Sequence, residues 1–91
     1  MGGHSEYKTD AEGLAKIAAW KSIVESHTGV SYPEFVVIHY TTQIVAGTNY
    51  KAKIRVGPSH IHVKIHEPLP HVEAGPHVME HSAGHSLEAI L

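Results

Sequence analysis

The sequence predicts an α+β fold, in which one amino-terminal helix packs on the apolar face of an antiparallel β-sheet. Three observations predict it: a helical apolar period between residues 10 and 27, a β-prone composition after Pro33, and two neighbouring segments that alternate apolar and polar side chains. A strand that alternates in this way has one apolar face, and a helix with an apolar stripe can cover that face. The 91 residues fit one domain, 1–91, with a single modest core.

The helix is expected over about residues 10 to 27. Thr9 followed by Glu12 has the form of a capping box, in which each side chain bonds a backbone N–H of the first turn. Gly29 suits a left-handed residue after the helix, and Pro33 cannot continue it. The predicted apolar stripe consists of Leu14, Ile17, Trp20, Ile23 and Val24.

Three or four antiparallel strands are expected after Pro33. "EFVVIHYTTQIV" forms the first, "NYKAKIRVG" and "HIHVKIHE" alternate clearly, and "PHVMEHS" is a weaker fourth candidate. One face of the alternating pair is predicted to face the core, and its side chains are Ala52, Ile54, Val56, Ile61, Val63 and Ile65. The opposite face is predicted to be exposed to solvent, and its side chains are Lys51, Lys53, Arg55, His60, His62, Lys64 and His66.

Composition excludes several function classes. Seven basic against nine acidic residues give a net charge of -2, which offers nucleic acid no basic stripe. The apolar stretches are far shorter than the roughly 20 residues of a membrane span. There is no cysteine, only one aspartate, Asp10, and no Gly-x-Ser-x-Gly elbow, so no nucleophilic enzyme is expected and no cofactor is indicated. The start, "MGGHSEYKTD", is not a secretory signal, so a cytoplasmic location is expected.

The segment "QIVAGTNY", residues 43–50, carries apolar side chains where the first two strands must turn. Gly47 can adopt a positive φ at little cost, which accounts for the turn. It does not account for Ile44, Val45 and Ala46 at the bend, where exposed apolar groups risk aggregation. Two explanations remain open from these residues: the tip fits a groove of a partner, or it folds back on its own domain.

The sequence resembles the cystatins, specifically the stefin or type 1 branch. "QIVAG" matches the QxVxG signature of the family, "TNY" matches stefins, and the likeness continues through "YKAKIRVG" and "IHVKIHEPLPH". It covers about residues 2 to 82, and the absence of cysteine fits stefins better than the disulfide-bonded branch. The resemblance implies a single cystatin-like domain whose helix packs on a curved antiparallel sheet of four to five strands.

What the resemblance implies for function is reversible, tight-binding inhibition of papain-like cysteine proteases, meaning cathepsins and their relatives. In this family an amino-terminal glycine segment and two hairpin loops form a wedge that occludes the active-site cleft. The matching residues here are Gly2 and Gly3, then Gln43, Ile44, Val45, Ala46 and Gly47, then Leu69, Pro70 and His71. Val45→Asp or Gly47→Arg is expected to weaken inhibition without unfolding the domain. A monomer is expected, with a domain-swapped dimer through the first hairpin as the alternative.

The ten histidines are the other unusual feature. The alternative function is therefore a His-rich metal-binding or protein-interaction module on a cystatin-like scaffold. His60 and His62 would share one strand face at a Cα spacing of ~6.6 Å, although no cysteine or spacing motif supports a metal site. Charging all ten histidines would move the formal charge from -2 to +8, so binding to a protease is expected to vary between pH 5 and 7.5.

Overall fold

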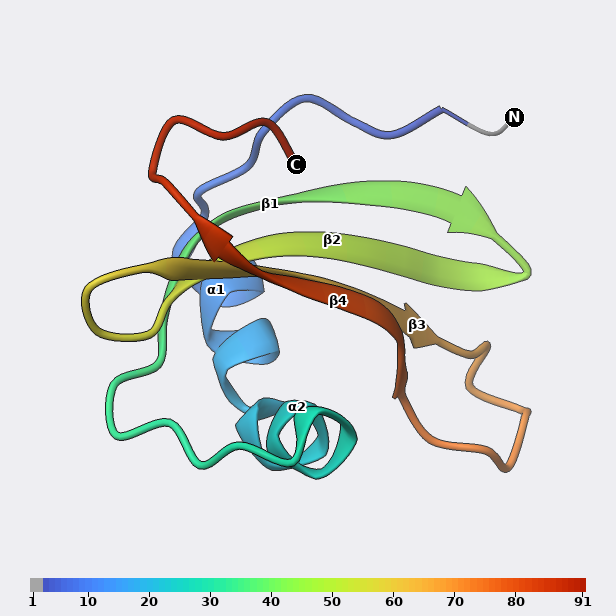
Figure 1. The fold of residues 1–91 in the computed structure, drawn as a ribbon. Helices are drawn as coiled ribbons and strands as arrows, with labels where there is room; N and C mark the ends of the chain where they lie inside the picture. Colours follow the sequence, from blue (N-terminus) through green and yellow to red (C-terminus); the bar gives the residue numbers. More distant parts are fainter. Residues whose placement is uncertain (1–2) are drawn as a thin grey trace.

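The computed structural model describes residues 3–91 and confirms the predicted α+β architecture (Figure 1). The helices are α1 (Ala11–Ala18) and α2 (Lys21–Thr28), and the strands are β1 (Val36–Val45), β2 (Gly47–Arg55), β3 (His60–Glu67) and β4 (His77–His85). All neighbouring strands are antiparallel and lie in the order β1-β2-β3-β4. Both helices lie on one side of this sheet, and neither is long and apolar enough to cross a lipid bilayer.

The predicted helix is divided into two by Ala19 and Trp20. The Trp20 N–H donates to the Ile17 carbonyl at 2.9 Å, which is the i to i−3 bond of a 3₁₀ turn and is tighter than an α-helical turn. The α-helical i to i−4 pattern resumes with the Val24 N–H, which donates to the Trp20 carbonyl at 3.1 Å. The break lets α1 pack against β1 while α2 packs against β4. A continuous amphipathic pattern could not reveal this change of direction.

Asp10, and not Thr9, caps the helix, so the predicted capping box is wrong. The Asp10 side chain accepts the Gly13 N–H at 2.9 Å and also accepts a hydrogen bond from the Tyr40 hydroxyl. A Cβ on Gly13 would lie 1.8 Å from the Tyr40 hydroxyl oxygen, so only glycine permits this approach of α1 to β1. The other end agrees with prediction, because Gly29 follows α2 with a φ of 75°.

The core lies between the helices and the inner face of the sheet, as the alternation predicted. Its buried side chains are Ile17, Val24, Tyr32, Val37, Tyr40, Tyr50, Ala52, Ile54, Ile61, Val63 and Ile65. Leu14, Trp20 and Val56 are only partly buried and pack around this cluster. We call the other side of the sheet, which carries Lys53 and His62, the outer face.

Lys53 is the clearest exception to the prediction that the outer face is exposed to solvent. Its side chain is 0% exposed, because residues 86–91 fold back over the outer face and enclose it. The ammonium donates to the carbonyls of Ser86 at 2.9 Å, Ala89 at 2.6 Å and Leu87. Alternation alone assigned Lys53 to solvent, because a strand's period of two contains no information about a later segment that covers its outer face.

The amino-terminal segment 3–8 runs antiparallel along the free edge of β1. Ser5 N–H bonds to the Thr42 carbonyl at 2.7 Å, and Lys8 and Tyr40 exchange two backbone bonds of 2.8 and 3.1 Å. We call this segment the arm. It supplies partners for backbone groups that would otherwise leave β1 as an open edge.

Candidate functional site

The tip of the β1–β2 hairpin is the most exposed apolar feature among the predicted site residues. Ile44 is 72% exposed and Val45 is 43% exposed, and Ala46 at the turn is also exposed. The tip therefore does not fold back onto its own domain. Of the two explanations open from the sequence, this geometry leaves the tip available to a partner.

Gly47 has a different role from the three residues before it, because it is buried and fixes the hairpin against the next loop. Its φ is 108°, and a Cβ here would lie 2.4 Å from the Glu67 carbonyl oxygen and 3.1 Å from the Pro68 Cα. Any larger residue must move that backbone as well as adopt a strained φ. Gly47→Arg would therefore disturb the fold itself, which corrects the expectation that it tests the surface alone.

The second loop joins β3 to β4 through residues 68–76 and carries the other predicted contacts. Leu69 is 39% exposed, and Pro70 and His71 are also exposed. Val72, which sequence reasoning missed, is 44% exposed, and its N–H bonds to the Leu69 carbonyl at 3.0 Å. This short turn gives the loop two apolar side chains where the pattern "PLPH" suggested only one.

A row of polar side chains on the outer face braces the two loops from behind. Asn49 donates to the Gln43 side-chain oxygen at 3.0 Å, and the Asn49 oxygen lies 2.7 Å from Nδ1 of His66. Gln43, Asn49 and His66 are also consecutive partners in the strand register. The row thus links the first hairpin to the end of β3, from which the second loop leaves.

Glu67 provides the matching brace on the inner face. The Lys16 ammonium lies 2.7 Å from its carboxylate, and the Tyr50 hydroxyl donates to the same carboxylate at 3.3 Å. The hydrogen bond to Glu67 is the largest influence on Lys16 and raises its pKa. The Lys16 ammonium also lies 5.4 Å from the centre of the Tyr50 ring. The base of the second loop is therefore tied to both α1 and β2.

The arm leads toward the same end of the molecule. His4 Nδ1 lies 3.1 Å from the Thr41 hydroxyl, and Thr42 N–H donates to the Ser5 hydroxyl at 3.0 Å, so the chain is held close to Gly3. Burial, followed by the charges of two nearby lysines, lowers the pKa of His4. Gly3 itself is exposed with open space around it, whereas Gly2 lies outside the described residues.

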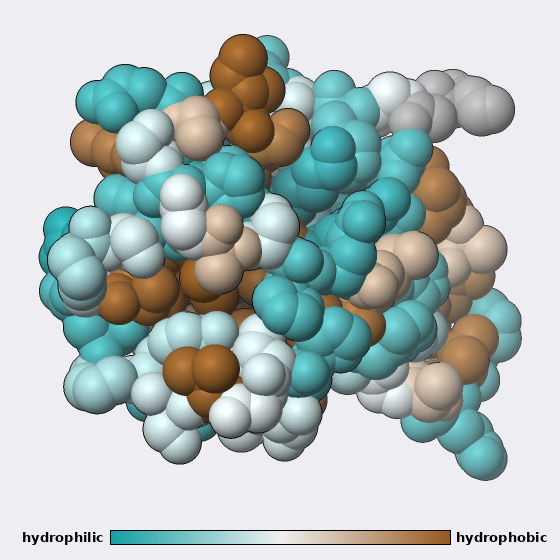
Figure 2. All heavy atoms as spheres, in the orientation of Figure 1, coloured by the Kyte–Doolittle hydropathy of each residue, from teal (hydrophilic) through white to brown (hydrophobic). Residues whose placement is uncertain are grey.

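The arm, the first hairpin and the second loop thus gather at one end of the sheet. Figure 1 shows the β1–β2 turn and the β3–β4 connection at the right-hand end, and the arm running above β1 toward it. In Figure 2 apolar surface is visible along the same right-hand edge, separated by polar surface from the apolar region at the top. The most exposed apolar side chains of the two loops are Ile44, Val45, Leu69 and Val72. We call this end the three-part edge.

The histidines do not assemble into the alternative metal site. His60 and His62 share the outer face as predicted, but the His62 ring stacks on His85 with centres 3.8 Å apart and planes within 7°. Within residues 3–91, no group of three or more histidine, cysteine, aspartate or glutamate side chains is arranged to hold a metal ion. The metal-binding alternative therefore gains no support from the part of the chain that the structure describes.

No family model matches the chain, but comparison with known proteins finds several relatives that are all of one family. The chain is 36% identical to leukocyte cysteine proteinase inhibitor 1 of Sus scrofa over 74 residues, which cover 79% of this chain and 72% of the relative. It is 39% identical to cystatin-A of Bos taurus and 38% identical to cystatin-B of Paralichthys olivaceus, each over 71 residues that cover 76% of this chain and 72% of the relative. Together with the helix-on-sheet fold and the "QIVAG" hairpin, these similarities show that the chain belongs to the cystatin family, in its stefin or type 1 branch.

Proposed function

We propose that this protein is a reversible, tight-binding inhibitor of papain-like cysteine proteases, which it blocks by inserting the three-part edge into the active-site cleft. The observation that carries the proposal is the exposed apolar tip at Ile44 and Val45, held on a braced hairpin. One of the relatives is named a cysteine proteinase inhibitor, and the others are named cystatins. The proposed contacts are Gly2, Gly3, Gln43, Ile44, Val45, Ala46, Leu69, Pro70 and His71, with Gly47 holding the hairpin in position.

Burial of the apolar tip supplies the favourable free energy of binding. Removing apolar surface from water is worth about 25 cal/mol per Å², so a few exposed side chains that enter a cleft contribute several kcal/mol. Ile44, Val45, Leu69 and Val72 all keep 39% or more of their surface in solvent and therefore have surface left to bury. Core side chains such as Ile54 and Ile65 are 0% exposed, so they cannot contribute in this way.

Rigidity keeps the cost of binding low. The Gln43–Asn49–His66 row and the Glu67–Lys16 pair hold both loops before any partner arrives. A loop that is already ordered loses less conformational freedom on docking than a flexible peptide with the same contact area. The arm is also partly ordered, because segment 4–8 is bonded to β1, so this segment too loses little conformational freedom on docking.

The same rigidity distinguishes an inhibitor from a substrate. Peptide cleavage requires the scissile carbonyl to reach near-attack geometry, about 3 to 3.5 Å from the nucleophile. Gly47 is packed against the Glu67 carbonyl and Pro68, so the hairpin backbone cannot readily extend into a cleft as an unfolded peptide does. We propose that the tip occupies the cleft without presenting a peptide bond to the protease thiolate.

A titration of active papain with the purified protein tests the proposal. We expect residual peptidase activity to fall linearly to zero at one molecule of inhibitor per active site, and to return after dilution or competition with a high substrate concentration. Val45→Asp should weaken the inhibition, because the carboxylate would have to lose water in an apolar contact. Failure of the unmodified protein to inhibit, or time-dependent cleavage of the hairpin by papain, would contradict the proposal.

The location and assembly state complete the proposed function. A cysteine-free chain has no disulfide to lose in a reducing compartment, so we propose that the protein acts in the cytoplasm. We also propose that the active form is a monomer, because a domain swap through the first hairpin would rearrange the tip that contacts the protease. Size-exclusion chromatography coupled to light scattering, with inhibition measured on each fraction, tests the assembly state.

A further inference from the structure

A fully buried lysine on the outer face is held by backbone carbonyls alone. The Lys53 ammonium is enclosed by the carbonyls of Ser86, Leu87 and Ala89, all in the segment that follows β4. Among residues 3–91 the ion pairs are Lys16–Glu67, Lys21–Glu25 and Arg55–Glu34, so no carboxylate neutralises Lys53 in the described part of the chain. An ammonium without a counter-ion is costly to bury and requires every one of its acceptors.

Four histidines lie beside Lys53 on the outer face, on the neighbouring strands. His39 of β1 and His62 of β3 are the register partners of Lys53, and His60 and His85 are paired next to them. His39 Nε2, His60 Nδ1 and His62 Nε2 are buried and have no hydrogen-bond partner. At His39 and His62, burial and the positive charge of Lys53 both disfavour the protonated imidazole.

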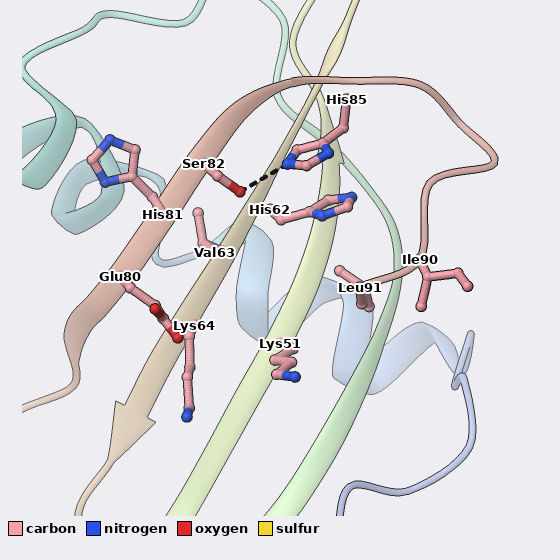
Figure 3. A pocket seen from close by; sticks show the side chains of 10 residues that line it. All are labelled: Lys51, His62, Val63, Lys64, Glu80, His81, Ser82, His85, Ile90 and Leu91. Atoms are coloured by element: carbon pink, nitrogen blue, oxygen red, sulfur yellow. Dashed lines mark hydrogen bonds between the residues drawn. The ribbon is translucent and has the colours of Figure 1, made fainter.

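The other charges near this cluster offer little compensation. Around the outer face lie Lys51, Arg55, Lys64, Glu80, His4 of the arm and Glu88 of segment 86–91, which we call the tail. His81 instead faces the helices, where its ring contacts His27 of α2. Arg55 is paired with Glu34 at 3.1 Å, and Glu80 stands opposite Lys64 in the register of β3 and β4. Figure 3 shows Glu80 beside Lys64, on the far side of the hollow from Ile90 and Leu91, and His62 stacked with His85 above it. This hollow of about 300 Å³ gives water a route to the cluster.

The tail and the arm meet over the same face. The Tyr7 ring stacks on His39 with centres 4.3 Å apart, and the Leu91 N–H donates to the Tyr7 hydroxyl at 3.2 Å. The arm continues from Tyr7 to Gly3 at the three-part edge. Contacts of the tail with Lys53 and Tyr7 therefore stabilise the arm as well.

We propose that segment 86–91 is an acid-sensitive strap, closed over Lys53 while His39 and His62 are neutral and released when they are protonated. Burial, with the neighbouring positive groups adding to it, lowers the pKa of His39 and brings the pKa of His62 to about 4. A lowered folded-state pKa means that the closed strap binds fewer protons than the open one. Closure is therefore fully favoured above pH 6.5 and weakens as the pH falls from 6.5 toward 4. Opening exposes Lys53 and frees Tyr7 and the arm.

Backbone NMR of the full chain tests the strap directly and needs no protease. We expect the ¹H–¹⁵N heteronuclear NOE of residues 86–91 to be that of an ordered chain at pH 7.5 and to fall to that of a mobile tail by pH 4.5. The ratio of open to closed strap should rise up to about tenfold for each pH unit below 6.5 per imidazole that gains a proton. Residues of the core, such as Ile54 and Ile65, should keep their NOE values and their chemical shifts over this range.

Three variants test which residues cause the pH-dependent release of the strap. H62Q replaces one of these imidazoles with a neutral amide and should move the midpoint of strap release to lower pH. H77Q changes an exposed histidine at the start of β4 and should leave the midpoint unchanged. K53M removes the ammonium that donates to the tail carbonyls. It should make the tail mobile at pH 7.5 while the chemical shifts of the core residues stay unchanged. In the unmodified protein, any one of three outcomes would overturn the proposal: the tail is already mobile at pH 7.5, the tail is still ordered at pH 4.5, or the tail is released only when the whole domain unfolds. Equal midpoints in H62Q and H77Q, or an ordered tail in K53M, would also overturn it.

Discussion

Ile44→Ser separates a binding role of the hairpin tip from a structural one. The Ile44 side chain is 72% exposed, so the folded protein uses little of its apolar surface. Full burial of an isoleucine side chain is worth about 1.5 to 3 kcal/mol, which leaves about 1 to 2 kcal/mol to be gained in a cleft. Because 1.4 kcal/mol is tenfold in an equilibrium constant, we expect the inhibition constant for papain to rise about 5- to 30-fold.

The stability of the same variant should hardly change. Exposed substitutions away from caps and strained positions usually alter the free energy of unfolding by about 0.5 kcal/mol or less. Ile90→Ser is a matched control, because Ile90 is 85% exposed but lies on the tail and outside the three-part edge. Inhibition constants come from steady-state titrations, and stability comes from urea unfolding of both variants. An unchanged inhibition constant for Ile44→Ser, or an equal rise for Ile90→Ser, would refute the reasoning.

Three further predictions concern the supports of the site and its pH dependence. Gly47→Ala should lower the urea midpoint by an amount equivalent to about 2 kcal/mol, because the new Cβ meets the Glu67 carbonyl at a φ of 108°; an unchanged midpoint would contradict this. Asn49→Ala should weaken papain inhibition, because it removes the bonds to Gln43 and His66, each worth about 1 kcal/mol, and crystal structures should show a displaced second loop. Stability should fall as the pH drops from 6.5 toward 4, since His62 has a lowered folded-state pKa of about 4, and H62Q should flatten that slope in urea titrations.

The inner face of the sheet was predictable because a strand alternates with a fixed period of two. Ala52 and Ile54 were assigned to the core from alternation alone, and both are 0% exposed. The hairpin tip was also predictable, because Gly47 marks the turn and the residues before it carry no charge. Local signals of this kind depend only on neighbours in the chain.

The supports of the site could not be predicted, because they join residues that are distant in sequence. Lys16 meets Glu67 only after α1 has packed on the sheet, and Asn49 meets His66 only once the register of β2 and β3 is fixed. Lys53 was assigned to solvent for the same reason, because the carbonyls that enclose it come from a segment more than 30 residues later. Periodicity describes one element at a time and does not contain these pairings.

The contact of Gly47 with the Glu67 carbonyl and Pro68 also constrains how such proteins can be redesigned. A new hairpin sequence cannot be transplanted independently of the following loop, because the backbone of each forms part of the other's surface. Engineers who wish to change target preference should exchange residues 43–47 together with 67–72 as one cassette. Variation in nature is expected to obey the same rule, with substitutions near Gly47 accompanied by compensating changes at the end of the third strand.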